Sequence, residues 1–137
     1  MTDRVVAHQG AACWATLFTH AHYLPCLAVL LQSTRACQTR YPLVVMVTET
    51  VDARTRERLT RMGCVLRDVD AWRVPHADGS LAFERFQNVW TKLRAFELYE
   101  YERVVMIDSD MLMCHNMDEL FDLPLAVSYT HLTLPTK

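Results

Sequence analysis

Two aspartates, Asp108 and Asp110, are the residues whose type and spacing most directly suggest chemistry. They follow an apolar run over residues 103–107 (RVVMI), and in an extended chain residues i and i+2 point the same way. Two carboxylates that face one point repel each other unless they share a cation or a proton. A hard divalent ion with oxygen ligands fits this pair, and a diphosphate would complete its coordination. The alternative is a pair of exposed loop acids that cap the following helix.

Two other groups of side chains are candidates for metal binding or reactivity. His20 and His22 form an H-x-H pattern of the kind that binds zinc, but no Cys, Asp or Glu clusters with them locally. They are therefore interpreted as surface or nucleotide-pocket histidines. The chain has 5 cysteines and no C-x-x-C pair, which favours reduced thiols packed as small hydrophobes in a cytoplasmic protein. A catalytic thiol is the alternative, and no cysteine is singled out for that role.

Apolar runs and helical spacings alternate along the chain, which indicates the elements that would position these side chains. Strands are expected at residues 13–19, 42–48, 64–69 and 103–107, with those at 13–19, 42–48 and 103–107 buried. Helices are expected at residues 23–40, 52–63 and 88–101, and a short one at 117–121. Asp52 is the expected N-cap of the second helix, and Trp14 and Trp90 are expected in the core. The alternation predicts the α/β class, with a mostly parallel sheet in the order 3-2-1-4 and flanking helices.

The composition narrows the class of protein further. The chain has 137 residues, of which 51% are hydrophobic and 22% charged, and its net charge is −2. This length suits one domain and is too short for two, and the charge balance argues against nucleic-acid binding. No apolar run approaches the roughly 20 residues of a membrane span and no secretory signal is seen, so a cytoplasmic location is expected. With 3 glycines, the chain has no Gly-rich phosphate-binding loop.

Residues 126–137 differ in character from the rest of the chain. Residues 127–137 (VSYTHLTLPTK) carry no charge before the terminal lysine and show no clean periodicity. Back-translated, they resemble a transposase adapter used in sequencing libraries, so we expect a non-native tail with few buried contacts. The domain itself is then expected to span residues 11–125. The alternative is a natural C-terminal strand rich in Thr and Leu.

Five sequence motifs follow one another in an order that is informative. They are A-T-L-F-T-H-A-H-Y-L from residue 15, L-A-V-L-L-Q-S from residue 27, L-V-V-M-V-T from residue 43 with V-x-x-x-x-R-x-x-L after it, N-V-W-T-K-L-R-A-F-E-L from residue 88, and R-V-V-M-I-D-S-D-M-L-M-x-x-N-M-D-E-L-F from residue 103. In this order they resemble glycosyltransferase family 8, the group of glycogenin and galactinol synthase. The resemblance covers about residues 11–125, and five motifs in order are far more specific than one.

This resemblance implies a Rossmann-like GT-A fold and a retaining hexosyltransferase that uses UDP-glucose or UDP-galactose with Mn²⁺ or Mg²⁺. Carried over by position, the site would comprise Leu17, Thr19, His20 and Tyr23 beside uracil and ribose, Lys92 at the phosphates or donor sugar, Ser109 near the ribose, and Asp108 and Asp110 at the metal. His20 stands where glycogenins commonly have Asn.

The family also uses groups that have no counterpart in this chain, among them a histidine metal ligand and a lysine near the phosphates. We therefore expect an inactive fragment, the N-terminal nucleotide-sugar-binding half of a GT-A domain. One alternative is a non-catalytic nucleotide-binding or scaffold fragment with a vestigial D-x-D. Another is a phosphoryl-transfer domain, which Met111 and Leu112 after the aspartates disfavour. The sequence identifies no acceptor and leaves open whether the complete protein is a homodimer.

Overall fold

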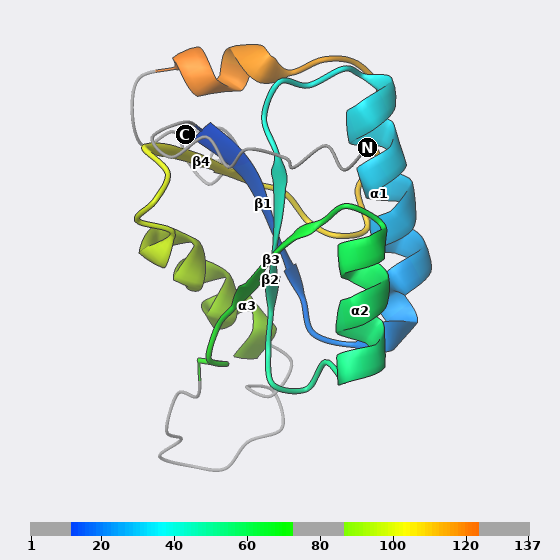
Figure 1. Ribbon diagram of the computed structural model, residues 1–137. Helices are drawn as coiled ribbons and strands as arrows, with labels where there is room; N and C mark the ends of the chain where they lie inside the picture. Colours follow the sequence, from blue (N-terminus) through cyan, green and yellow to red (C-terminus); the bar gives the residue numbers. More distant parts are fainter. Residues whose placement is uncertain (1–11, 73–86, 124–137) are drawn as a thin grey trace, which may run out of the picture.

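A parallel β-sheet forms the centre of the molecule. The computed structural model describes residues 12–72 and 87–123. Its elements are β1 (Ala12–Phe18), η1 (Ala21–Tyr23), α1 (Leu24–Ala36), β2 (Leu43–Val47), α2 (Ala53–Arg61), β3 (Val65–Asp68), α3 (Gln87–Thr91), η3 (Lys92–Glu97), β4 (Arg103–Met106) and η4 (Asp118–Asp122). Within the described residues the sheet has four parallel strands in the order β3-β2-β1-β4, with α1 and α2 on one face and α3 on the other (Figure 1). The predicted α/β class and strand order are confirmed.

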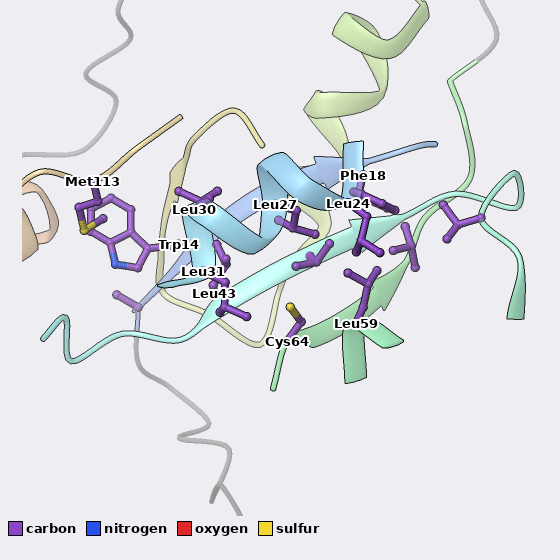
Figure 2. Close-up of a cluster of buried hydrophobic side chains, with 14 of the residues drawn as sticks. Trp14, Phe18, Leu24, Leu27, Leu30, Leu31, Leu43, Leu59, Cys64 and Met113 are labelled. Atoms are coloured by element: carbon purple, nitrogen blue, oxygen red, sulfur yellow. The ribbon is translucent and has the colours of Figure 1, made fainter. Parts of the chain in front are cut away.

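The central strand β1 is buried along its whole length, and its alternate side chains point to the two faces of the sheet. Trp14 and Phe18 pack with Leu27 of α1 in the larger hydrophobic cluster (Figure 2). Leu17 points to the other face, where it belongs to a second cluster with Leu98. Burial on both faces explains why β1 and β2 have continuous apolar sequences rather than alternating ones.

The polar helix α2 begins and ends where the sequence predicts. The Asp52 carboxylate accepts hydrogen bonds from the backbone N–H of Thr55 (2.9 Å) and from the Thr55 hydroxyl (2.9 Å), as an N-cap does. These bonds hold the pKa of Asp52 below its usual value. Gly63 lies just beyond the helix with a φ of 88°, a left-handed conformation that favours glycine and ends the helix.

Helix α1 is shorter than the predicted range of 23–40. Pro25 occupies its first turn, as expected for a residue that lacks an N–H donor. The helix ends at Ala36, and Gln38 takes a left-handed conformation with a φ of 54°. This reversal directs the following residues back toward the sheet, where β2 begins at Leu43.

The segment predicted as one amphipathic helix over 88–101 is divided into α3 and the 3₁₀ helix η3. A 3₁₀ helix has three residues per turn, so it does not maintain the apolar stripe that a 3.6-residue period would form. Leu98 remains in the core, but Trp90 is 42% exposed and Phe96 82% exposed. The prediction that Trp90 is a core residue is therefore wrong, whereas Trp14 is fully buried as predicted.

Strand β4 is half-buried rather than buried as predicted. In the described part of the sheet it pairs with β1 alone, so one of its edges is unpaired. Residues 73–86 lie outside the described residues, and so does the whole of the predicted tail at 126–137. Neither 12–72 nor 87–123 contains a helix with the length and apolar content needed to cross a membrane.

Candidate functional site

The two aspartates lie where β4 leaves the sheet beside the central strand. The backbone N–H of Ile107 donates to the carbonyl of Ala15 (2.8 Å), so the parallel ladder with β1 reaches one residue beyond β4. Asp108 is the next residue, at the carboxyl end of the strand. Open parallel sheets bind ligands outside this edge, between neighbouring strands. The prediction that Asp108 directly follows a strand paired with β1 is confirmed.

The conformation of this segment differs from the one assumed in the sequence argument. The backbone N–H of Met111 donates to the carbonyl of Asp108 (3.2 Å), and Ser109 and Asp110 form the middle of a turn. The segment is therefore not extended, and the relative directions of the two carboxylates are set by the turn rather than by strand alternation. Their expected convergence on one cation stays a prediction.

Lys92 reaches Asp108 from the α3 side of the sheet. It is the first residue of η3, and its ammonium group forms an ion pair with the Asp108 carboxylate. Both side chains are partly exposed, at 35% for Lys92 and 52% for Asp108. The Asp110 side chain is exposed and has no hydrogen-bond or ion-pair partner among residues 12–72 and 87–123. The structure thus brings Lys92 and Asp108 together, although they are distant in sequence.

The predicted nucleoside-binding residues lie at the carboxyl end of β1. Thr19 is buried, and its hydroxyl is 2.8 Å from Nδ1 of His20. His20, His22 and Tyr23 are exposed, and their rings lie tilted against one another, with centroids 5.4 Å apart for the two histidines and 4.1 Å apart for His22 and Tyr23. The Leu17 side chain lies in the core and does not project beyond the strand end. The region therefore offers aromatic and imidazole faces above a buried threonine.

Sequence reasoning missed a set of hydrogen bonds that fixes the neighbouring strand ends. The Thr50 hydroxyl donates to the carbonyl of Thr19 (2.6 Å), which ties the loop after β2 to the end of β1. Arg56 donates to the carbonyls of Thr48 (2.8 Å) and Val51 (2.8 Å) and forms an ion pair with Asp68 of β3. The available signal was the arginine in V-x-x-x-x-R-x-x-L, but its partners became evident only from the fold.

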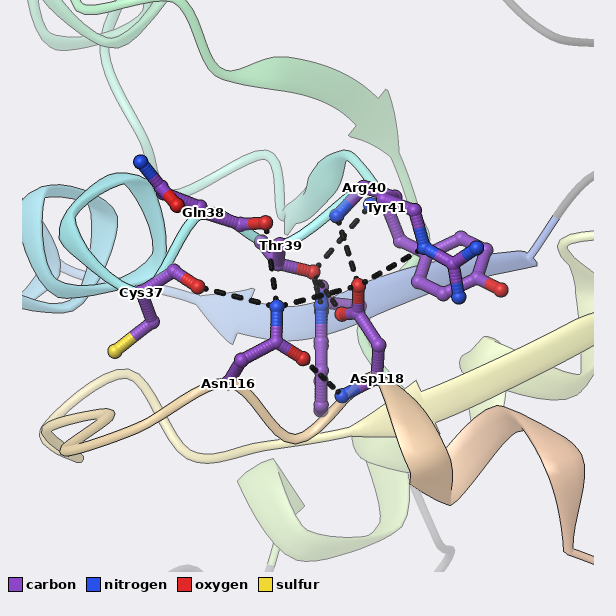
Figure 3. Close-up of polar contacts among 8 residues, drawn as sticks. Cys37, Gln38, Thr39, Arg40, Tyr41, Asn116 and Asp118 are labelled. Carbon is purple, nitrogen blue, oxygen red and sulfur yellow. Dashed lines mark hydrogen bonds and ion pairs between the residues drawn. The ribbon is translucent and has the colours of Figure 1, made fainter.

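A second polar group lies at the opposite end of the sheet. We define the Asp118 cluster as Thr39, Arg40, Asn116 and Asp118 (Figure 3). Asp118 accepts from the Thr39 hydroxyl, from the Arg40 backbone N–H (3.0 Å) and from the Arg40 side chain (3.4 Å). Asn116 donates to Asp118 (3.5 Å) and to the carbonyls of Cys37 (3.1 Å) and Gln38 (3.2 Å).

The Asp118 carboxylate is not available to a metal ion, because it is buried and already hydrogen-bonded. It is only 6% exposed, and burial alone would raise its pKa. The hydrogen bonds from Thr39, Arg40 and Asn116 outweigh that effect and hold the pKa below its usual value. With its oxygens engaged, Asp118 acts as a structural carboxylate at the start of η4, a 3₁₀ helix that lies where a short helix is predicted at residues 117–121.

The described residues contain no group of three or more His, Cys, Asp or Glu side chains that could hold a metal ion. The H-x-H pair therefore has no third protein ligand among the described residues. Asp108 and Asp110 supply two carboxylates, so a cation bound to them needs further ligands from water or a bound phosphate. An apolar hollow of about 590 Å³ lies between α1 and residues 112–114, and none of the candidate site residues lines it.

All five cysteines are free. Burial raises the pKa of Cys13 to about 12 and that of Cys64 to about 11, so neither forms a nucleophilic thiolate at neutral pH. Cys26 and Cys114 are exposed, however, so the prediction of packed cysteines holds only for part of the set.

The chain is similar to several galactinol synthases. It is 30% identical to galactinol synthase 5 of Arabidopsis thaliana over 129 residues, which is 93% of this chain and 39% of that relative. It is 33% identical to galactinol synthase 2 of Solanum lycopersicum over 95 residues, or 69% of this chain and 28% of the relative. Galactinol synthase 2 of Ajuga reptans is 34% identical over 94 residues, 69% of this chain and 32% of the relative. No protein-family model matches the chain.

The parallel sheet, the strand-end aspartates and these relatives together define the chain as a glycosyltransferase-type α/β protein of the Rossmann-like GT-A kind. More specifically, it belongs with the galactinol-synthase-like sequences of glycosyltransferase family 8, a hexosyltransferase family. The chain spans between 28% and 39% of the length of these three relatives.

Proposed function

We propose that these residues form the donor-binding part of a metal-dependent, retaining hexosyltransferase that takes UDP-glucose or UDP-galactose. The observation that carries this proposal is the position of Asp108 and Asp110 at the carboxyl end of β4, beside the end of β1 with Thr19 and His20. The relation to galactinol synthases supports the hexosyl donor.

The donor set at the strand ends fits a hard divalent cation such as Mn²⁺ or Mg²⁺. Asp108 and Asp110 supply carboxylate oxygens, and Asp110 has no competing partner in the described part of the chain. Such an ion, when bound, would neutralise charge on the leaving diphosphate. A site with two protein ligands depends on the diphosphate itself to complete the coordination, so cation and nucleotide are expected to bind together.

The chain's own residues would orient the donor. The Lys92 ammonium lies on the same side of the sheet as Asp108 and would neutralise phosphate charge. His20 and Tyr23 present exposed rings for the base, and Thr19 fixes one nitrogen of His20. Ser109, between the two aspartates, would lie near the ribose. Leu17 would support this surface from below, because its side chain is in the core.

The direct test is Mn²⁺-dependent binding of UDP to the 137-residue chain, measured by isothermal titration calorimetry. We expect Asp108→Asn and Asp110→Asn to weaken this binding at least about tenfold, since each removes a charged ligand of the cation. Asp122→Asn is the matched control, because Asp122 is an exposed aspartate of η4. Equal UDP affinity in all four proteins would contradict the proposed site.

Turnover is proposed to need the part of the relatives that this chain does not match. Hydrolysis and transfer from UDP-glucose and UDP-galactose with Mn²⁺ would then be negligible for these 137 residues. Robust turnover by the chain alone would overturn this part of the proposal. A cytoplasmic location is also proposed, and the five free cysteines support it.

A further inference from the structure

The Asp108 carboxylate, one of the two oxygen donors of the proposed metal site, already has a cationic partner. The Lys92 ammonium pairs with it across the gap between η3 and the end of β4. Lys92 is one of only two lysines in the sequence, the other being Lys137. A divalent cation and this ammonium group therefore require the same carboxylate.

The backbone that carries Lys92 is held firmly while its side chain is not. Thr91, the preceding residue, is buried at 1% exposure, and its hydroxyl accepts a hydrogen bond from the backbone N–H of Trp72 (3.0 Å). The Lys92 side chain keeps about a third of its surface in solvent. The ammonium group can therefore move between nearby anions while its stem stays in place.

The charged side chains that follow Lys92 in residues 93–100 contact groups other than Asp108. Arg94 pairs with Glu97 within η3 and also donates to the carbonyl of Asp70 (3.1 Å). Glu100 pairs with Arg67 of β3. Lys92, Asp108 and Asp110 together carry a net charge of −1, and both carboxylates of the proposed site would be open to a divalent cation only when Lys92 leaves Asp108.

We propose that Lys92 exchanges Asp108 for the diphosphate of the donor, so that the divalent cation and the nucleotide each increase the affinity of the site for the other. This inference rests on the proposed function. Without nucleotide, the ammonium group competes with the cation for Asp108. A bound diphosphate gives Lys92 a second anionic partner and releases Asp108 to the cation. Because coupling between two ligands is reciprocal, the cation must strengthen nucleotide binding by the same factor.

The test is a titration with Mn²⁺, in which electron paramagnetic resonance follows the free ion, with and without UDP. The proteins are the unchanged chain, Lys92→Met, Lys92→Gln and Arg61→Met. Arg61→Met is the matched control because it removes one positive charge from an exposed ion pair. Arg61 is the last residue of α2 and pairs with Glu57. The association of Mn²⁺ with UDP in buffer is measured separately and subtracted, and circular dichroism checks that each variant is folded.

Without UDP, both Lys92 variants should bind Mn²⁺ about two- to fivefold more tightly than the unchanged chain, the range for loss of a partly exposed ion pair. UDP should tighten Mn²⁺ binding to the unchanged chain at least about fivefold, and by clearly less in the Lys92 variants. Arg61→Met should match the unchanged chain in both titrations.

Two further variants separate failure of this inference from failure of the proposed function. If Asp108→Asn and Asp110→Asn bind Mn²⁺ as well as the unchanged chain, the metal site itself is wrong. If they bind it more weakly, but Lys92→Met and Lys92→Gln show no gain in Mn²⁺ affinity and an unchanged effect of UDP, the metal site stands and the exchange by Lys92 is wrong.

Discussion

Asp118 and Asp110 are eight positions apart in one segment of the chain, yet they have opposite surroundings. Asp118 lies at the end of the sheet where the strands begin, is buried, and accepts hydrogen bonds from Thr39, Arg40 and Asn116 (Figure 3). Asp110 lies at the other end, is exposed, and has no partner in residues 12–72 and 87–123. Asp108, beside it, has Lys92 as its ion-pair partner.

This difference separates a structural carboxylate from one that is available to a ligand. A buried carboxylate whose oxygens are all engaged stabilises the fold and has no capacity left for a cation. An exposed carboxylate at a strand end can lack a protein partner with little loss of folding free energy, and its oxygens remain available to bind a ligand. Substitutions at the two positions should therefore affect different measurable properties.

The largest expected effect on stability comes from Asp118→Asn. The new amide nitrogen would present hydrogens toward the donors of Arg40 and Asn116, which leaves these partly buried donors without an acceptor. We expect the free energy of unfolding in urea to fall by about 2–3 kcal/mol. Asp122→Asn, at an exposed position in the same 3₁₀ helix, should change it little. A neutral Asp118→Asn would show that the cluster does not stabilise the fold.

The contribution of Asp118 should depend on pH with a defined sign. Its folded-state pKa is below the usual value, so the unfolded chain binds more protons near pH 4. The stabilisation is complete above the unfolded-state pKa and is lost as pH falls through the lower folded-state value. The stability difference between the unchanged chain and Asp118→Asn should thus narrow between about pH 6 and pH 3 in urea unfolding. A difference that widens in acid would be inconsistent with this reading.

A smaller effect is expected at the N-cap of α2. Asp52→Ala removes the acceptor for the Thr55 N–H and hydroxyl, but this position is exposed and water can replace the bonds. The melting temperature should fall, and by less than in Asp118→Asn. Asp52→Ser, which keeps a capping oxygen, should restore most of the loss. A larger loss in Asp52→Ala than in Asp118→Asn would reverse the ranking.

The smallest effect on stability should come from Asp110→Asn. Because Asp110 has no partner in the described residues, its substitution is expected to change the free energy of unfolding by no more than about 0.5 kcal/mol in either direction. Removal of one negative charge near Asp108 in the sequence would slightly raise the free energy of unfolding of the variant. A loss comparable with that of Asp118→Asn would mean that Asp110 has a structural role.

The architecture of the sheet could be predicted from sequence because it depends on local patterns. Continuous apolar runs indicated strands with both faces covered, and β1 and β2 have that environment. The same reasoning failed for β4, whose apolar sequence gives no sign that it pairs with one neighbour only. It also failed for Trp90, because spacing alone does not show that an α-helix changes to a 3₁₀ helix at Lys92.

The candidate site could be predicted in its residues but not in its contacts. The position of Asp108 after β4 followed from the strand pattern, whereas the turn at Ser109 and Asp110 did not. The difference between Asp118 and Asp110 was also beyond sequence reasoning. Thr39 and Arg40, the partners of Asp118, are 79 and 78 positions away, and only the folded chain brings them together.

The most direct test of this account measures two properties for the same two variants, namely the free energy of unfolding and the Mn²⁺-dependent affinity for UDP. Asp110→Asn should retain its stability and lose affinity, by at least about tenfold. Asp118→Asn should lose stability, while its folded fraction binds UDP as the unchanged chain does. If Asp110→Asn instead loses stability with unchanged UDP affinity, or if folded Asp118→Asn no longer binds UDP, the assignment of the two aspartates is contradicted.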